Sequence, residues 1–516
     1  MPWTIVHAVT CAQCGERTAA IFIRRSVSGS GPLGGEGPAQ GGGSDLALCE
    51  ICARSRGITA AKGRLDIGIE ELMRAAAVPA SESGMPAACP SCGSSLAQLR
   101  RLGRLGCPSC IEAFYPAIRR AFGPLPREAS PRTAPSSAVA VERPPLAPSA
   151  PPPEAGPTSF PFLASGGGHD SDVVLSSSVS LSRSIEGLPF PGGPGGGAAP
   201  SRSLVSHALE GLPRLRRWTM RQLDPATRRC LSERGLVPRS YAADPEALLA
   251  ASIDFPLYVL ADEGEHLRLR ARFPGLALEA GIGAVQELHD RLAARGLRFL
   301  WDPRIGWVCA SIEDCGIGMS LALSLHLPAL AMTGLHERFL RSILREGVAV
   351  RGSYSEGESS AGAVYEAVIG PSSRLGLDGM VDGMRAIAEQ ASQAERRARA
   401  ELASKARGEL LDALGRAYGL ALHAHRLGPG EGAALASTLR LGAILGLLRK
   451  EADNETEAVG SSLVDRLGRC MECMGPASIA AESGLAEQRS GAEDEELRSE
   501  FLRSALKGAM LLVGGH

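Results

Sequence analysis

The sequence predicts a multidomain α+β protein, in which a cysteine-rich module, a proline-rich linker, a domain of mixed strands and helices and a helical domain follow one another. Three observations support this division of the 516 residues. Eight of the 13 cysteines fall in the first 110 residues, and 11 prolines lie between Pro124 and Pro157. Beyond Ser171, strand and helix patterns alternate before helix-forming residues dominate. We place the domains at 1–123, 124–169, 170–400 and 401–516.

Composition and charge favour a cytoplasmic protein. The net charge of −1 and the pI of about 6.8 provide no global field that would attract nucleic acid or an anionic membrane. The N-terminal segment MPWTIVHAVTC has neither a basic stretch nor a long apolar stretch typical of a secretion signal. The uncharged run Cys315–Gly334 contains several serines, a histidine and a proline, which favours a buried globular segment over a membrane span.

The cysteines of the first module are arranged as four C-x-x-C pairs. Two thiolates at this spacing in a tight turn reach one ion, and two such turns complete a tetrahedral S4 set for zinc. In the reducing cytoplasm, cysteines are metal ligands before they are disulfides. We therefore predict two structural Zn²⁺ sites in a zinc-ribbon or treble-clef-like module. The first set is Cys11, Cys14, Cys49 and Cys52, and the second is Cys89, Cys92, Cys107 and Cys110.

A nucleic-acid role for this module is a weaker alternative. Arg100, Arg101 and Arg104 form one small basic cluster, but it lacks the interleaved aromatic residues of a base-stacking surface. The linker that follows cannot form a helix or the interior of a sheet, because proline lacks the donor that both require. Its Pro/Ala/Ser composition indicates a semi-extended spacer that keeps the module at high effective concentration near the next domain.

The next domain begins with a serine-rich segment, Val173–Pro191, VVLSSSVSLSRSIEGLPFP. Its polar and apolar residues alternate with the period of a half-buried strand. Bare serines are unusual on a polar strand face, so the segment indicates either a site for small hydroxyls or one that has lost larger groups. After it we predict a mostly helical stretch at Leu209–Arg234, a strand with a charged turn at Phe255–Arg270, a helix at Gly283–Gly296, and a long helical region from Leu377 to Leu427.

Two resemblances follow from these residues. CPSCGSSLAQLRRLGRLGCPSCIEAFYPAIRRAFG, from Cys89 to Gly123, is similar to the zinc region of the bacterial activator of protein arginine kinase. Residues 170–450 resemble the ATP:guanido phosphotransferases, most closely the bacterial protein arginine kinase. The motifs that carry this second resemblance are VVLSSSVSLSRS, DEGEHLRLR, WDPRIGWVCASIEDCGIGM with SLALSLHLPAL after it, and VRGSYSEGESSAG. It implies an antiparallel sheet flanked by helices, followed by a helical domain.

The resemblance assigns nucleotide-binding positions, and several of them have lost their charge. Active members hold the ATP phosphates with five arginines. Three of those positions are Ser178, Ser180 and Ser320 here, and two arginines are kept, Arg268 and Arg351. Charged hydrogen bonds contribute about 1.5–3 kcal/mol each, so three losses would weaken ATP binding roughly a thousandfold or more.

The catalytic positions implied by the resemblance are also depleted. Gly264 replaces one of two catalytic carboxylates, Ser311 replaces the reactive thiol, and Ser324 replaces the histidine beside the adenine. The second carboxylate is kept as Glu356.

Neighbouring groups are poor substitutes for the missing ones. Glu263 and Glu265 flank Gly264, but in an extended segment they would point to the opposite face. Cys309 would need a register shift to reach the pocket. The kept His326 lies in an apolar run, which favours a core histidine over a ligand.

These observations favour a regulatory pseudokinase of protein quality control and the stress response, fused to an activator-like zinc module. Its partners would be proteins: a true arginine kinase, a Clp-type chaperone ATPase, or a second copy of the chain. The alternative is an active protein arginine phosphotransferase, using ATP and Mg²⁺ in a remodelled site that contains Glu356, Arg268 and Arg351. A third possibility is a zinc-ribbon adaptor or nucleic-acid-binding module. We expect no membrane partner.

Overall fold

The computed structural model describes residues 85–122, 172–193, 196–345, 348–352, 361–371, 375–450, 462–483 and 490–512, together with four short strands nearer the N-terminus. Those strands form two antiparallel pairs, β1 (Ile21–Ile23) with β2 (Leu46–Leu48) and β3 (Thr59–Ala61) with β4 (Arg64–Asp66). Residues 84–96 and 104–516 belong to one compact unit, and residues 1–83 with 97–103 to another.

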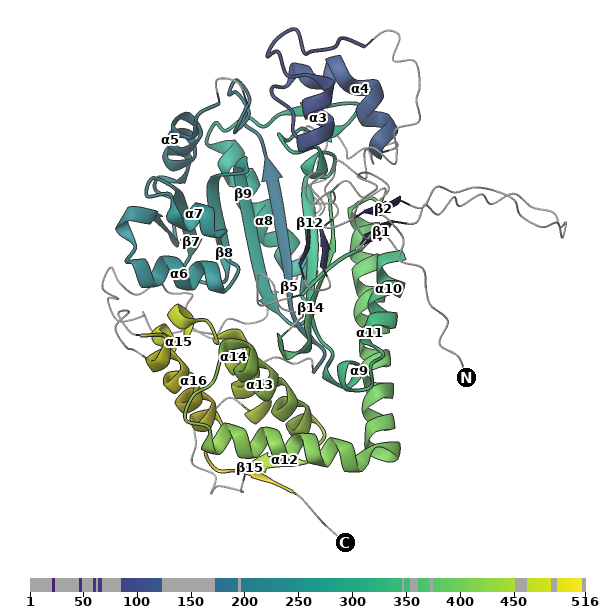
Figure 1. Ribbon diagram of the computed structural model, residues 1–516. Helices are drawn as coiled ribbons and strands as arrows, with labels where there is room; N and C mark the ends of the chain where they lie inside the picture. The colour runs from purple at the N-terminus through teal and green to yellow at the C-terminus, as the bar shows by residue number, and fades with distance from the viewer. Residues whose placement is uncertain are drawn as a thin grey trace, which may run out of the picture. The chain divides into compact units, whose positions relative to one another are not determined.

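The larger unit is built on an eight-stranded antiparallel sheet with the strand order β13-β14-β12-β5-β9-β8-β7-β6 (Figure 1). The serine-rich segment forms the central strand β5, which pairs with β9 on one side and β12 on the other. The strands are β5 (Val174–Arg183), β6 (Leu215–Thr219), β7 (Leu248–Ser252), β8 (Leu257–Glu263), β9 (Glu265–Pro274), β12 (Met319–His326), β13 (Ala349–Gly352) and β14 (Val364–Ile369).

Alternation along the central strands separates an apolar face from a polar one. Val179 and Leu181 are buried, while Ser178 and Ser180 are half-buried. The predicted alternation is therefore confirmed, but the strand is more deeply buried than predicted, because Ser176, Ser177 and Ser182 are buried as well. Helix α8 (Leu278–Ala294) packs on the apolar face, and an added Cβ at Gly281 would come within 2.7 Å of Val179 Cγ2. The close approach of helix and strand therefore requires glycine, which has no side chain, at this position.

Helices surround the sheet and form the C-terminal region. The remaining elements before that region are α3 (Leu96–Leu102), α4 (Ser109–Phe122), α5 (Ala198–Leu209), α6 (Pro225–Glu233), α7 (Arg239–Ala243), β10 (Trp301–Asp302), β11 (Gly306–Trp307), α9 (Pro328–Met332) and α10 (His336–Arg345). The C-terminal elements are α11 (Leu377–Lys405), α12 (Arg407–His423), α13 (Pro429–Ile444), β15 (Leu448–Lys450), α14 (Leu463–Glu472), α15 (Pro476–Ser483), α16 (Gly491–Ala505) and β16 (Ala509–Leu511).

The prediction of a mostly helical stretch at Leu209–Arg234 is wrong at its centre. Leu215–Thr219 forms β6 at the edge of the sheet, where Trp218 pairs with Leu249 of β7. Helix propensity is a weak prior, and cross-strand pairing overrides it here. The predicted strand with a charged turn at 255–270 is present as the β8–β9 hairpin, the helix predicted at 283–296 is α8, and the long helical region is divided into α11 and α12.

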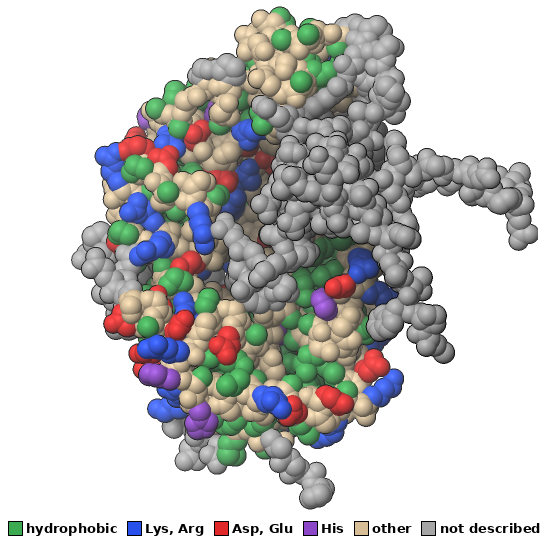
Figure 2. Space-filling view, viewed as in Figure 1, with side chains coloured by type: hydrophobic (Ala, Val, Ile, Leu, Met, Phe, Trp, Pro, Cys, Tyr) green, Lys and Arg blue, Asp and Glu red, His purple; other side chains and the backbone are tan. Residues whose placement is uncertain are grey.

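The uncharged run Cys315–Gly334 is the globular segment that we expected. It forms β12 and α9, and Leu321, Leu323 and Leu325 are fully buried in the core of the sheet. Within the described residues, no helix combines the length and the hydropathy needed to cross a bilayer. On the face drawn in Figure 2, basic and acidic side chains are interspersed over the described surface, in agreement with the net charge of −1.

Candidate functional site

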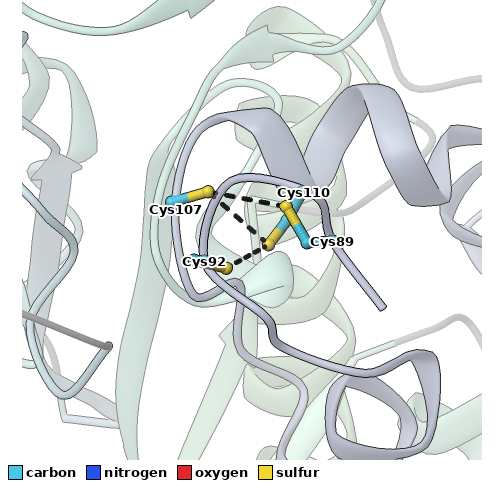
Figure 3. Close-up of side chains that lie close together, drawn as sticks. All are labelled: Cys89, Cys92, Cys107 and Cys110. Carbon is cyan, nitrogen blue, oxygen red and sulfur yellow. Dashed lines mark hydrogen bonds between the residues drawn. The ribbon is translucent and has the colours of Figure 1, made fainter. Parts of the chain in front are cut away.

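Four cysteines gather into one cluster (Figure 3). The Sγ atoms of Cys89 and Cys107 lie 3.7 Å apart, those of Cys92 and Cys110 3.4 Å apart, and those of Cys107 and Cys110 3.9 Å apart. All four sulfur atoms lie within 4.8 Å of one another. Four thiolates at these separations match the donor set of a tetrahedral zinc site. The second predicted cysteine set is therefore brought together, whereas Cys11, Cys14, Cys49 and Cys52 lie outside the described residues.

Local backbone turns place these sulfur atoms. Cys89 N–H donates to the Ser94 carbonyl and Gly93 N–H donates to the Cys89 carbonyl, with Gly93 in the left-handed conformation (φ 74°) that closes the turn. Cys110 N–H donates to the Cys107 carbonyl, and α4 continues from this turn. Burial raises the pKa of Cys92, but hydrogen bonds from Ser94 outweigh it and lower the pKa of the thiol to about 7. A thiolate is the form that binds a metal.

Gly106 makes room for the cluster, and its substitution should weaken metal binding. A Cβ at this position would lie 2.1 Å from Ser94 Oγ and 2.8 Å from Cys92 Sγ, so Gly106→Ala must push Cys92 away from the other sulfur atoms. We expect at least a tenfold loss of zinc affinity, measured by competition with a colorimetric chelator. Gly197→Ala is the matched control, because no atom lies within 4 Å of a Cβ added there. Equal affinities of the two variants would contradict the prediction.

The polar face of the central strands is the second candidate site. Ser180 lies directly opposite Ser320 of β12 on one side and Arg270 of β9 on the other. Ser178 lies opposite Arg272 on β9. Residues that face each other across antiparallel strands share one face of the sheet. Three of the positions singled out in the sequence, Ser178, Ser180 and Ser320, are therefore neighbours on one surface.

Arginines of β9 lie on this same face, and carboxylates neutralise them. Arg268 Nε lies 2.6 Å from Glu263 Oε2, and Arg268 Nη2 lies 2.9 Å from Asp314 Oδ2. Burial lowers the pKa of Arg268, but Asp314 and Glu263 outweigh it and raise the pKa. Arg270 lies 3.5 Å from the same Glu263, and Arg272 pairs with Glu472 of α14 at 3.0 Å. The row Arg268-x-Arg270-x-Arg272 has the period of a strand, a signal that our sequence analysis did not use.

The expectation that Glu263 faces away from the polar face is wrong. Gly264 is the tip of the β8–β9 hairpin and has φ 72°, and Asp262 also has a positive φ of 65°. These two left-handed residues interrupt the regular alternation that the prediction assumed. Glu263 consequently turns its carboxylate towards Arg268 and Arg270.

Glu265 is fully buried and fixes the segment that contains Ser311. Its carboxylate accepts hydrogen bonds from Ser311 N–H (2.7 Å), Ala310 N–H (2.8 Å) and Ser184 Oγ (3.0 Å). Burial raises the pKa of Glu265 to about 7, although these amides and the charge of Arg104 act in the opposite direction. The carboxylate orders the backbone at Ala310 and Ser311 and is buried away from solvent.

Cys309 and His326 are core residues. Cys309 is fully buried, and burial raises the pKa of its thiol well above its ordinary value, so it is a core thiol and not a reactive thiolate. His326 Nε2 lies 2.8 Å from Ser437 Oγ, and its Nδ1 lies 2.6 Å from Arg440 Nη1. Burial lowers the pKa of His326 well below its ordinary value, so the ring is neutral. The interpretation of His326 as a core histidine is confirmed.

Two further predicted positions lie on strands of the sheet, and Ser324 shares the face of Ser320 because the two residues are four apart on β12. Ser324 lies opposite Glu366 of β14 and Ser176 of β5. The backbone of Arg351 in β13 pairs with Glu366. Glu356 lies outside the described residues.

Two family models match this chain. The ATP:guanido phosphotransferase C-terminal catalytic domain matches residues 202–398, and the McsA central zinc-finger domain matches residues 87–128. The protein-arginine kinase of Caldanaerobacter subterraneus subsp. tengcongensis is 28% identical over 350 residues, which cover 66% of this chain and 98% of that protein. The protein-arginine kinase of Exiguobacterium sp. is 30% identical over 282 residues, which cover 54% of this chain and 80% of that protein. The chain belongs to the protein-arginine kinase family.

Protein-arginine kinase homology and the zinc-finger match occupy one chain, so the fusion of the two modules is confirmed. Among solved structures, the crystal structure of lombricine kinase aligns with a TM-score of 0.41 and 16% identity, over 57% of this chain and 81% of that one. The zinc-finger match contains all four clustered cysteines, which fit a zinc ion in number, chemistry and spacing.

Proposed function

We propose that this member of the protein-arginine kinase family is a regulatory pseudokinase that no longer transfers phosphate. One observation carries the proposal: the polar face that should hold the ATP phosphates has serines at 178, 180 and 320, and its Arg268 is ion-paired with Glu263 and Asp314. Phosphoryl transfer depends on positive charge that neutralises and positions the triphosphate. An arginine already paired with two carboxylates contributes little of that charge.

The acceptor side of the site supports the same proposal. A guanidinium is strongly basic, so phosphoryl transfer to it requires carboxylates and a thiolate that orient it and assist its deprotonation. At Gly264 the left-handed turn disfavours any larger residue, and Ser311 offers a hydroxyl that is a weak base. The Ser180 hydroxyl is buried and has no hydrogen-bond partner among the described residues, which agrees better with a lost larger side chain than with a designed polar surface.

In this proposal the zinc ion has a structural role and no catalytic one. A closed S4 site leaves no open coordination position for a substrate, so the metal holds the fold of residues 85–122. We further propose that the chain works by binding proteins in the cytoplasm, within quality control and the stress response. Its candidate partners are an active arginine kinase, a Clp-type chaperone ATPase, or a second copy of this chain.

Incubation of the full chain with labelled ATP, Mg²⁺ and an arginine-rich protein tests the proposal. We expect no acid-labile phosphoarginine and no heat of ATP binding in calorimetry. Restoring charge with Ser178→Arg and Ser180→Arg together should make ATP binding measurable, with an affinity at least tenfold above the detection limit that the unmodified protein fails to reach, because each charged hydrogen bond contributes about 1.5–3 kcal/mol. Ser203→Arg, at an exposed position on α5, is the control and should leave ATP binding unchanged. Robust phosphoarginine formation by the unmodified protein would refute the pseudokinase.

A second candidate is an active phosphotransferase with a remodelled site. The observation in its favour is the row of arginines on β9, because Arg270 and Arg272 add positive charge beside the emptied positions. This alternative uses Arg268, Arg351 and Glu356 with ATP and Mg²⁺. It predicts measurable ATP binding that Arg351→Ala abolishes, and calorimetry without any nucleotide heat would exclude it.

A further inference from the structure

The zinc module contacts the candidate acceptor site through a short backbone pairing. Arg104 forms an antiparallel bridge with Ser311, and Leu105 N–H donates to the Ala310 carbonyl at 2.7 Å. All these residues belong to the same compact unit. Ser311 is the position at which the family resemblance expects the reactive thiol, so the bridge places the zinc module at that position.

The Arg104 side chain makes a second contact there. Its Nη2 donates to the Gly264 carbonyl at 2.6 Å and to the Pro191 carbonyl at 3.1 Å. Gly264 is the position at which the resemblance expects a catalytic carboxylate. Arg104 thus contacts both positions at which the resemblance expects the groups that bind and activate a substrate guanidinium: its guanidinium is held at Gly264, and its backbone pairs with Ser311.

Two further contacts, which do not involve Arg104, also hold the zinc module in place. Glu112 Oε2 of α4 lies 2.7 Å from Arg304 Nη2, and the Arg304 guanidinium carbon lies 4.8 Å from the centre of the Tyr115 ring. In addition, a Cβ at Gly193 would come within 2.4 Å of the Gly106 carbonyl oxygen, so the loop after β5 packs directly on the zinc-binding turn. Arg104 therefore belongs to a surface of the zinc module that makes several contacts with the rest of the compact unit.

We propose that the acceptor site of this fold persists as an arginine-binding site, and that its resident ligand is Arg104 of the zinc module. This inference rests on the proposed function, because it explains what the emptied site binds. The acceptors that remain are neutral carbonyl groups, which hold a guanidinium by hydrogen bonds and do not remove its proton. An arginine side chain of a partner protein would compete with Arg104 for the same carbonyls and would release the bridge at Ser311.

Hydrogen exchange on the full zinc-loaded chain tests the resident ligand. Arg104→Ala and Arg104→Lys should each speed exchange of the Leu105 amide about tenfold or more, since a lysine cannot reproduce the planar guanidinium fork. Arg119→Ala, at an exposed position on α4, is the matched control and should leave that amide unchanged. Zinc content and thermal unfolding of all variants report whether the module still folds. Unchanged Leu105 exchange in a folded Arg104→Ala protein would overturn the proposal.

Competition supplies the second measurement. An arginine-rich peptide should bind Arg104→Ala at least tenfold more tightly than the unmodified protein in calorimetry, and a lysine-rich peptide of the same length should bind both equally. Equal affinity of the arginine-rich peptide for the two proteins would also overturn the proposal. The phosphotransfer assay separates this inference from the pseudokinase. Phosphoarginine that forms only in Arg104→Ala would refute the pseudokinase and leave Arg104 as the resident ligand.

Discussion

Removal of the metal from the four-cysteine cluster should unfold residues 85–122 while the sheet of the larger unit stays folded. The four sulfur atoms lie within 4.8 Å of one another, and burial raises the pKa of Cys107 and of Cys110, so without an ion these thiols stay protonated and nothing bonds the two turns to each other. Structural zinc sites contribute roughly 10–16 kcal/mol to the folding of small modules, more than any other single interaction in this segment. We expect Cys110→Ser, or a strong chelator, to expose this segment to limited proteolysis and to abolish the protection of the Leu105 amide.

The matched control replaces a cysteine that is not a ligand. Cys470 is buried in the core of the C-terminal helices, so Cys470→Ala should keep the zinc content and the proteolysis pattern of the unmodified protein. Metal analysis of the purified chain should show the loss of one zinc in Cys110→Ser. Full zinc content in that variant, together with an intact segment, would rule out the cluster as a structural metal site.

Loss of the Glu265 carboxylate should be the most destabilising single change on the kinase-like sheet. Glu265→Ala leaves the amides of Ala310 and Ser311 and the Ser184 hydroxyl without their acceptor inside the core. Each unsatisfied buried group costs about 1–3 kcal/mol, so we expect the free energy of unfolding to fall by about 3 kcal/mol or more in urea titrations. Glu186→Ala removes an exposed carboxylate nearby and should change the free energy of unfolding by less than about 0.5 kcal/mol.

The same carboxylate should give stability a definite pH dependence. Burial raises the pKa of Glu265 from 4.5 to about 7 in the folded protein, so the folded state binds the proton more tightly than the unfolded state. The contribution to stability is complete below about pH 4.5 and is lost as the pH rises to about 7. The difference in pKa corresponds to about 3 kcal/mol. Glu265→Gln has no proton to lose, so its unfolding free energy should lack this slope; an unchanged slope would assign the dependence to other groups.

Patterns of residue spacing predicted the metal cluster and the serine face, because both depend on local geometry. Two C-x-x-C turns place four sulfur atoms together whatever surrounds them, and strand alternation places Ser178 and Ser180 on one face. The ion pairs of Arg268 could not be predicted from residue spacing. They depend on the left-handed residues Asp262 and Gly264, and a sequence alone gives no φ angles at a hairpin tip.

Long-range contacts could not be predicted from the sequence either. Arg104 was grouped with Arg100 and Arg101 as a basic cluster, because nothing local to the zinc module indicates that Gly264, 160 residues away, accepts its hydrogen bond. The edge strand at Leu215–Thr219 was missed for the same reason: its leucine and arginines suit a helix, and only pairing with β7 makes it a strand. Sequence periodicity reports which face a residue occupies and not which distant segment covers it.

The central position of β5 has a consequence for synthesis of the chain on the ribosome. β5 is the first strand of the sheet to be made, yet its two neighbours are β9 and β12, and β12 ends at His326. At translation rates of about 5–20 residues per second, the unpaired backbone edge of β5 waits roughly 7 to 30 seconds for the second partner. During that interval a nascent strand with one unpaired edge is open to association with other chains. Ribosome-bound chaperones should therefore affect the yield of this protein more strongly than that of a sheet assembled from sequential hairpins.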